Sequence, residues 1–257
     1  MTSDGAIEHN PSPELSIVVP ALNEVDNVGP LAEQVAAAMG ERPFELIVVD
    51  DGSTDGTSER LTDLAATRPW LRVLRRSRAQ GQSAAMAAGI AAARGAFVAT
   101  LDADLQNDPA DLPHMLDLLR EQNVDFVQGD RSKNRQDTFF RRRASWVGRT
   151  ARRLVIGDSV RDTGCSARVM RADLAKRLPL QYKGMHRFFP AYSRLLGARI
   201  AEYQVRHHPR AAGETKYGVG VLQRGLGGFF DLLVVRWMAK RIRDVRVDEL
   251  APTRSEP

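Results

Sequence analysis

The stretch FELIVVDDGSTDG (Phe44–Gly56) begins as a near-continuous apolar run rich in Val and Ile and then turns abruptly acidic. A run such as Phe44–Asp50 predicts a parallel strand that is buried on both faces of a sheet. Leu15–Pro20 (LSIVVP) has the same character, and the segment VGPLAEQVAAAM between the two runs carries apolar residues at helical spacing. Strand, helix and strand in this order predict the first unit of an α/β fold.

The alternation continues towards the C-terminus. In the first half, further strands are predicted at Leu71–Arg76, Gly95–Asp102 and Val124–Asp130, with helices at Gly81–Arg94 and Asp108–Gln122. In the second half, strands are predicted at Thr163–Met170 and Arg199–His207, with helices at Arg171–Leu178, His186–Leu196 and Leu222–Ala239. This order predicts a doubly wound, mostly parallel α/β sheet, whose ligands bind beyond the carboxyl ends of its strands.

The length of 257 residues suits one large domain. Met1–Pro13 is polar and contains Pro, Ser and acidic residues, so we expect a disordered lead-in over residues 1–13 rather than a signal peptide, and a cytoplasmic protein. We expect a folded domain over residues 14–218, an apolar and basic helix over 219–246 and a tail over 247–257. The single cysteine, Cys165, excludes an internal disulfide.

Charge is distributed unevenly along the chain. Residues 1–129 carry 9 Lys and Arg against 20 Asp and Glu, whereas residues 130–257 carry 28 against 12. This asymmetry suits a site that binds a cation at one end and an anion at the other, and it also fits solvated surface charge. The basic second half allows a different class of function, a nucleic-acid-binding module, although few aromatic residues lie between its Arg residues.

Polar and acidic residues follow three of the predicted strands directly, in the motifs P-A-L-N-E, V-D-D-G-S-T-D-G and L-D-A-D-L-Q. One such motif is explained as a turn, but three at one edge of a sheet favour a binding site. The dinucleotide motif G-x-G-x-x-G after the first strand and the P-loop motif are missing. Asp51–Gly56 begins like a calcium loop, but the twelfth position is Thr62 rather than Glu, which excludes that loop.

The motif L-D-A-D-L-Q places Asp102 and Asp104 two residues apart, just past a predicted strand. Carboxylate oxygens are hard ligands that suit Mg²⁺ or Mn²⁺. Such an ion neutralises a diphosphate leaving group. A D-x-D pair alone is common by chance, and its position at the acidic edge is what points to a metal site.

Several ordered motifs resemble those of the inverting family 2 glycosyltransferases with the nucleotide-sugar (type A) fold. They are P-A-L-N-E, V-V-D-D-G-S-T-D-G-T, G-Q-S-A-A-M-A-A-G and L-D-A-D-L-Q-N-D-P. The segments Asn134–Arg142, Asp162–Arg168 and His207–Tyr217 are similar to the polyprenyl-phosphate branch, which includes undecaprenyl-phosphate aminoarabinose transferases and dolichol-phosphate mannose synthases. The likeness runs from about Leu15 to Tyr217.

The resemblance implies a set of residues that bind the nucleotide-sugar donor. Those expected at the nucleotide are Pro20, Leu22, Glu24, Val49 and Asp51. Those expected at the diphosphate and its metal are Asp102, Ala103, Asp104 and Gln106, with Asp102, Asp104 and Gln106 as metal-binding residues and either Mg²⁺ or Mn²⁺ as the cofactor. The expected cationic residues around the phosphates are Arg131, Arg210 and Lys216, and the catalytic set is Asp102, Asp104 and Arg131.

The acceptor implied by the resemblance is a polyprenyl phosphate, and Arg141, Arg142 and Arg143 are candidates to bind its phosphate or the membrane surface. A phosphate monoester has a second pKa of ~6 and is largely dianionic at neutral pH, so we expect direct inverting displacement without a dedicated general base. The donor is GDP-mannose or a UDP-sugar, and the product serves envelope glycan or glycolipid synthesis. The alternatives are another acceptor, a non-catalytic scaffold, or the nucleic-acid-binding module.

Leu226–Ala239 is apolar but spans only 14 residues and includes Asp231 and Arg236. A membrane-spanning helix needs roughly 20 apolar residues, so this segment does not cross a bilayer alone. Lys240, Arg241 and Arg243 follow it, which fits an amphipathic helix at an anionic membrane surface. The alternative is a helix packed on the core. We expect peripheral attachment to the inner face of the cytoplasmic membrane, or a membrane partner subunit.

Overall fold

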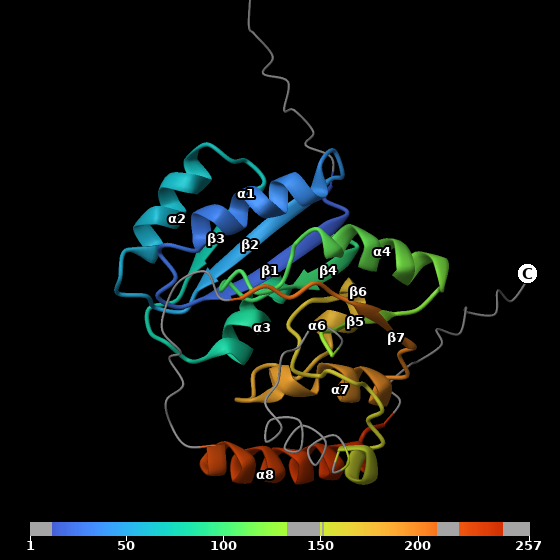
Figure 1. The fold of residues 1–257 in the computed structure, drawn as a ribbon. Coiled ribbons are helices and arrows are strands. Elements are labelled where there is room, and N and C mark those ends of the chain that lie inside the picture. Colours follow the sequence, from blue (N-terminus) through green and yellow to red (C-terminus); the bar gives the residue numbers. More distant parts are fainter. Residues whose placement is uncertain (1–11, 133–149, 151, 210–220, 244–257) are drawn as a thin grey trace, which may run out of the picture.

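The computed structural model describes residues 12–132, 150, 152–209 and 221–243, and it places a sheet between layers of helices (Figure 1). The strands are β1 (Leu15–Ala21), β2 (Phe44–Asp50), β3 (Leu71–Arg75), β4 (Phe97–Thr100), β5 (Phe126–Asp130), β6 (Arg168–Arg171) and β7 (Ile200–Gln204). Their order in the sheet is β3-β2-β1-β4-β6-β5-β7. Only β6 runs antiparallel to its neighbours β4 and β5, and the other pairs are parallel.

Helices cover both faces of the sheet (Figure 1). One face carries α1 (Val28–Met39), α2 (Thr57–Ala66) and α4 (Asp111–Glu121). The other carries α3 (Gln82–Ala92), α6 (Ala172–Lys176), the 3₁₀ helix η1 (Met185–Phe188) and α7 (Phe189–Leu195). Each face has its own cluster of buried apolar side chains, as expected for a sheet buried on both sides.

The predicted doubly wound, mostly parallel α/β fold is confirmed. The structure differs from the prediction in detail. The segment Gly95–Asp102 forms a strand only over Phe97–Thr100, because the chain leaves the sheet before Asp102. The predicted strand Thr163–Met170 starts only at Arg168, because the residues before it form a loop. The predicted helix His186–Leu196 is divided into η1 and α7.

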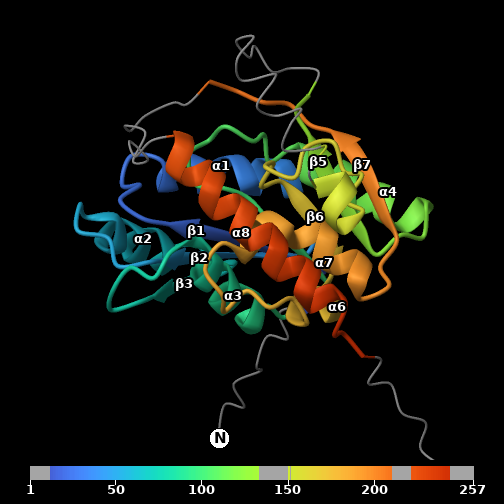
Figure 2. The same ribbon diagram turned by 90° about the horizontal axis from the view of Figure 1, so that it is seen from below.

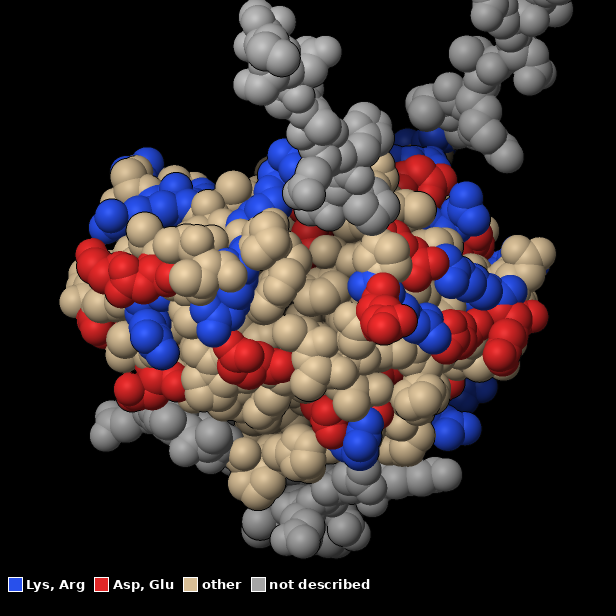
Figure 3. Space-filling model, turned by 90° about the horizontal axis from the view of Figure 1, so that it is seen from above, with Lys and Arg blue, Asp and Glu red and all other residues tan. Residues whose placement is uncertain are grey.

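The face formed by α1, α2 and α4 carries Arg interspersed with Asp and Glu (Figure 3). Ion pairs join elements across it. Arg42 forms a bidentate pair with Asp117, both of whose contacts are 2.8 Å, and Arg68 lies 2.5 Å from Glu33. Mixed charge of this kind is typical of a solvated surface.

The opposite face is closed by α8 (Val221–Ala239), which lies across α3 and α7 (Figure 2). Leu232 and Val235 on this helix are buried in the apolar cluster of that face. Phe230, Val234 and Trp237 on its other side are exposed. One side of α8 therefore packs on the core and its outer side remains apolar, while the expected contact with a membrane stays a prediction. None of the described helices is long and apolar enough to cross a membrane.

Helix α3 packs very closely on the sheet at Gly89. A Cβ atom added there would meet the Val18 side chain and would lie 3.1 Å from Val49 Cγ2. Both valines are fully buried, so neither has room to move. The absence of a side chain at residue 89 is thus what allows α3 to approach β1 and β2.

We expect Gly89→Ala to destabilise the protein by about 1–2 kcal/mol, because overpacking outweighs the gain of about 1 kcal/mol in helix propensity. Urea denaturation measures this change. Ala91→Gly, at an exposed position of the same helix, gives the propensity difference without the packing change. A Gly89→Ala variant more stable than the wild type would show that α3 shifts away from the sheet.

Candidate functional site

A cavity of about 270 Å³ lies at the carboxyl edge of the parallel strands. Its lining comes from the end of β1, the turn after β2, the start of α3 and the turn after β4. The lining residues are Pro20, Ala21, Leu22, Glu24, Asp51, Gly81, Gln82, Ala85, Asp102, Ala103 and Asp104. Seven of the donor-site residues predicted from the sequence are among them. Segments up to 84 residues apart thus meet where the sheet topology predicts a ligand.

The two carboxylates of the D-x-D motif lie close to each other where little water reaches them, so their negative charges repel. Asp104 is 9% exposed and Asp102 is half-buried. Burial raises the pKa of Asp102 above its usual range, and the neighbouring charge of Asp104 raises it further. A hydrogen bond from Ser166 and the charges of Arg168 and Arg131 act in the opposite direction. The pair is therefore electrostatically suited to a cation.

Gln82 is a cavity residue that the sequence analysis did not single out. Its Nε2 atom donates a 2.7 Å hydrogen bond to Oδ1 of Asp102. An amide that donates to one carboxylate oxygen fixes the orientation of that carboxylate. Gln82 lies within the quoted motif G-Q-S-A-A-M-A-A-G, but nothing in the motif identifies its partner.

Asp51 holds the loop that leads into α3. Its carboxylate accepts hydrogen bonds from the backbone N–H of Gln80 at 3.1 Å and of Gly81 at 2.6 Å, and it lies 3.3 Å from Nε of Arg76. Asp51 is 3% exposed and still lines the cavity. The predicted nucleotide-binding residue thus also shapes the cavity wall.

The structure places two predicted donor-site residues away from the cavity lining. The Val49 side chain is fully buried in the apolar cluster against α3. Its expected contact with the nucleotide stays a prediction. Gln106 follows Asp104 in the same loop, and its backbone oxygen accepts a 2.8 Å hydrogen bond from the N–H of His208.

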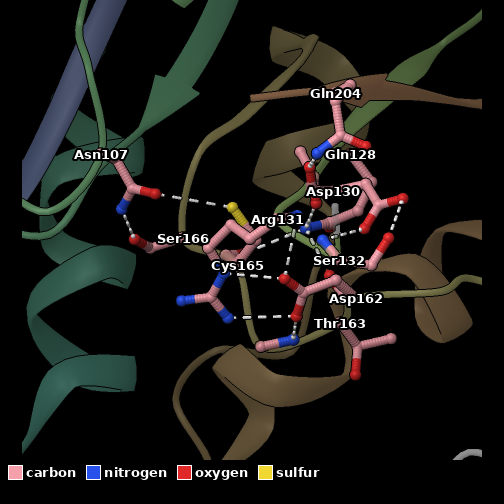
Figure 4. Close-up of polar contacts among 12 residues, drawn as sticks. Asn107, Gln128, Asp130, Arg131, Ser132, Asp162, Thr163, Cys165, Ser166 and Gln204 are labelled. Carbon is pink, nitrogen blue, oxygen red and sulfur yellow. Dashed lines mark hydrogen bonds and ion pairs between the residues drawn. The ribbon is translucent and has the colours of Figure 1, made fainter. Parts of the chain in front are cut away.

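Arg131 directly follows β5 and forms a buried ion pair (Figure 4). Its Nε lies 2.7 Å from Oδ2 of Asp162, and its Nη2 lies 3.0 Å from Oδ1. Burial alone lowers the pKa of Arg131, but the hydrogen bonds and charge of Asp162 raise it above its ordinary value. Asp162 is the first residue of the segment Asp162–Arg168, which is similar to the polyprenyl-phosphate branch and whose residues were given no individual roles from the sequence.

The loop before β6 reaches the same edge because β6 is antiparallel. Thr100 Oγ1 at the end of β4 donates to the backbone oxygen of Ser166 at 2.6 Å, and Asn107 Nδ2 donates to Ser166 Oγ at 2.7 Å (Figure 4). Cys165 is fully buried beside them, and burial raises the pKa of its thiol to about 11. This thiol is therefore a neutral core group rather than a nucleophile.

Other predicted cationic residues fall outside the described residues. These are Arg141, Arg142, Arg143, Arg210 and Lys216. The described chain up to Pro209 nevertheless runs beside the D-x-D loop, since His207 forms a β-bridge with Asn107.

His186 is a half-buried residue that joins η1 to α3. Its Nδ1 lies 2.7 Å from Oγ of Ser83, and its backbone N–H donates to the same oxygen at 3.2 Å. Burial and the nearby charge of Arg168 lower the pKa of His186 to about 4. The imidazole is therefore neutral at neutral pH.

The donor set at the cavity fits a divalent cation shared with a diphosphate. Among the described residues, no cluster of three or more His, Cys, Asp or Glu side chains is arranged to hold a metal ion. The cavity offers two carboxylates, Asp102 and Asp104. Mg²⁺ in phosphoryl and nucleotide sites takes one or two carboxylates and completes its coordination with phosphate oxygens and water.

Comparison with known proteins identifies relatives of this chain. Residues 16–178 match the model of glycosyl transferase family 2. A dodecaprenyl-phosphate galacturonate synthase from Rhizobium johnstonii is 41% identical over 232 residues, which cover 88% of this chain and 68% of the relative. An undecaprenyl-phosphate 4-deoxy-4-formamido-L-arabinose transferase from Edwardsiella ictaluri is 37% identical over 210 residues, 80% of this chain and 63% of the relative. The chain thus spans about two thirds of the length of these curated relatives.

Solved structures share the fold at lower identity. A mannosyltransferase from Pyrobaculum calidifontis in complex with GDP-Man and Mn²⁺ is 20% identical with a TM-score of 0.62, over 93% of this chain and 66% of that one. A glucosyl-3-phosphoglycerate synthase from Mycobacterium tuberculosis in complex with Mn²⁺, UDP and glucosyl-3-phosphoglycerate is 21% identical with a TM-score of 0.61. The match covers 91% of this chain and 82% of that one. Both are type A glycosyltransferase folds, and both of those structures contain Mn²⁺.

We expect His186 to make the stability of the protein depend on pH. His186 binds a proton near pH 6.5 in the unfolded chain and only near pH 4 in the folded chain. The free energy of unfolding is therefore highest above about pH 6.5, and it falls by about 2–3 kcal/mol as the pH drops towards 4. Urea denaturation between pH 7 and 4 measures this loss. His186→Asn keeps an acceptor near the Nδ1 position but does not titrate. Parallel pH profiles of the two proteins would contradict the assignment.

Proposed function

The chain belongs to glycosyl transferase family 2, in the branch that contains polyprenyl-phosphate sugar transferases, and we propose that it transfers a sugar from a nucleotide diphosphate to a polyprenyl phosphate. The observation that carries this proposal is the cavity at the carboxyl edge of the sheet, in which Asp102 and Asp104 lie beside residues from β1 and Asp51. Two buried carboxylates favour a metal-bound diphosphate over a bare anion.

In this proposal Asp102 and Asp104 hold Mg²⁺ or Mn²⁺ together with the donor diphosphate, and Gln106 assists from the same loop. The bound ion neutralises charge on the leaving diphosphate. Leu22 and Asp51 line the part of the cavity that receives the nucleoside, which belongs to GDP-mannose or to a UDP-sugar. The acidic edge alone would repel the phosphates of a nucleic acid, so we favour the enzyme over a nucleic-acid-binding module.

The cationic residues of the second half have two roles in the proposal. Arg131, Arg210 and Lys216 neutralise the phosphates around the reaction. Arg131 is close enough to Asp102 for their charges to interact. Arg141, Arg142 and Arg143 bind the acceptor phosphate. A dianionic phosphate attacks the anomeric carbon directly and inverts it, so the protein supplies positioning and charge stabilisation rather than a general base.

A lipid acceptor requires contact with a membrane, and α8 provides a suitable surface. Phe230, Leu233, Val234 and Trp237 recur at helical spacing on its outer side, and Trp237 is 57% exposed. Leu154 is 76% exposed on a neighbouring helix turn, where Arg236 donates a 2.7 Å hydrogen bond to the backbone oxygen of Val155. The exposed cations on and after α8 are Arg236, Lys240, Arg241 and Arg243. Apolar and basic groups together fit peripheral binding to the inner face of the cytoplasmic membrane, or to a membrane partner subunit.

We expect Asp104→Asn to reduce sugar transfer about 100-fold or more, because it removes one of two charges that hold the cation. The assay offers labelled GDP-mannose and UDP-sugars with undecaprenyl or dolichyl phosphate, with Mn²⁺ or Mg²⁺ and with EDTA. Asp117→Asn, which changes only the surface ion pair with Arg42, is the matched control and should retain activity.

Undiminished transfer by Asp104→Asn would remove the metal role of that residue. Metal-dependent hydrolysis of one donor without any lipid product would keep the glycosyltransferase assignment and discard the polyprenyl acceptor.

We expect the double substitution Phe230→Ser and Trp237→Ser to weaken binding to phosphatidylglycerol vesicles at least about 10-fold, because it removes the two largest apolar side chains of the outer side of α8. Co-sedimentation with vesicles measures the loss of binding. Comparison with neutral phosphatidylcholine vesicles gives the electrostatic contribution to binding. Equal binding by the variant and the wild type would exclude this side of α8 as the membrane contact.

A further inference from the structure

Two hydrogen bonds tie the first turn of α3 to η1, although their residues are 103 positions apart in the chain. Ser83 Oγ accepts from the backbone N–H of His186 at 3.2 Å and pairs with His186 Nδ1 at 2.7 Å. Ser83 is 4% exposed, so water does not compete for these bonds. No role in the proposed reaction has been assigned to either residue above.

The direction of the second bond depends on the tautomer of His186. Ser83 Oγ accepts the His186 N–H and still has its own hydroxyl proton to donate to Nδ1. A bond in this direction requires a neutral imidazole whose proton is on Nε2. The neutral state of His186 agrees with this arrangement. We assign this tautomer to the pair.

The residue before Ser83 reaches the D-x-D motif. Gln82 Nε2 donates to Asp102 Oδ1 at 2.7 Å, so the position of the first turn of α3 determines where this amide lies. On the other side of this turn, the backbone N–H of Gly81 donates a 2.6 Å hydrogen bond to Oδ2 of Asp51. Gly81 adopts a φ of 93°, a backbone conformation that residues with a side chain rarely adopt. The hydrogen bonds to Asp51 and to His186 therefore hold the two sides of this turn.

We propose that Ser83 and His186 are positioning residues that orient the Asp102 carboxylate through Gln82. This inference rests on the proposed function, because it assigns the three residues a part in holding the metal and diphosphate. Removal of the Ser83–His186 pair frees the start of α3, the Gln82 amide leaves Asp102, and the cation site loses its preset geometry. Groups that orient a metal-binding side chain typically change metal affinity about 10-fold to 100-fold when removed.

The competing explanation is that His186 is a core histidine whose partner only stabilises the packing of η1 on α3. The two explanations differ in what they predict for the single substitutions of Ser83 and His186. If these residues act through Gln82, their removal weakens metal binding while Gln82 is present and has no further effect once Gln82 is gone. A packing role leaves the metal affinity unchanged in the Ser83 and His186 variants and lowers only the stability.

The test measures binding of Mn²⁺ by electron paramagnetic resonance in the presence of UDP or GDP, without acceptor or turnover. We expect Ser83→Ala, His186→Ala and Gln82→Ala each to weaken Mn²⁺ binding about 10-fold. His186→Asn places an acceptor near the Nδ1 position and should restore most of the affinity, whereas His186→Gln places it near the Nε2 position and should not. Arg42→Ala, which breaks a distant ion pair, lowers stability and leaves Mn²⁺ binding unchanged.

The decisive variant combines Gln82→Ala with His186→Ala. When His186→Ala alone weakens binding, an affinity of the double variant equal to that of Gln82→Ala supports the proposal. A further loss of about 10-fold overturns it, because His186 would then act independently of Gln82. Wild-type affinity in Ser83→Ala and His186→Ala also overturns it and leaves the proposed function intact. A wild-type protein that binds no Mn²⁺ with either nucleotide overturns both.

Discussion

Like-charge crowding at the end of β4 is the constraint around which the site is organised. Asp102 and Asp104 are two residues apart, and burial and the charge of Asp104 both oppose the ionisation of Asp102. The nearest cations do not remove this cost directly, since Arg131 is paired with Asp162, and Arg168 bonds to Gln128 and the Thr163 backbone. A cation between the carboxylates would relieve the repulsion. The same arrangement that disfavours an empty site thus favours a metal bound together with a diphosphate.

The antiparallel strand β6 supplies the other half of the site. A parallel strand at that position would bring its following residues to the cavity edge, whereas β6 brings the residues that precede it. Asp162 and Ser166 are carried there, next to Arg131 after β5 and Thr100 at the end of β4. The acidic first half and the basic second half of the chain therefore meet along one edge of the sheet, which gives the charge asymmetry of the sequence a structural counterpart.

The sequence was sufficient for the parts of the fold that depend on local pattern. Apolar runs and turn residues predicted Phe44–Asp50 correctly at both ends, and the order of motifs predicted the residues that line the cavity. Contacts made at long range were not foreseeable. The burial of the Val49 side chain against α3 is one example, because a strand buried on both faces has no alternation that shows where each side chain points. The bonds of Gln82 to Asp102 and of Ser83 to His186 depend on how α3 is seated, which no spacing reveals.

The position of β6 also has a consequence for how the chain folds as it leaves the ribosome. Strands β1 to β4 pair only with one another and with β6, so a four-stranded sheet is available once Thr100 has emerged. Strand β5 has β6 and β7 as its neighbours, and both are synthesised later. Its backbone N–H and C=O groups therefore stay without strand partners until the chain up to Gln204 has been synthesised. During that interval the nascent protein carries a hydrophobic strand edge of the kind that chaperones shield.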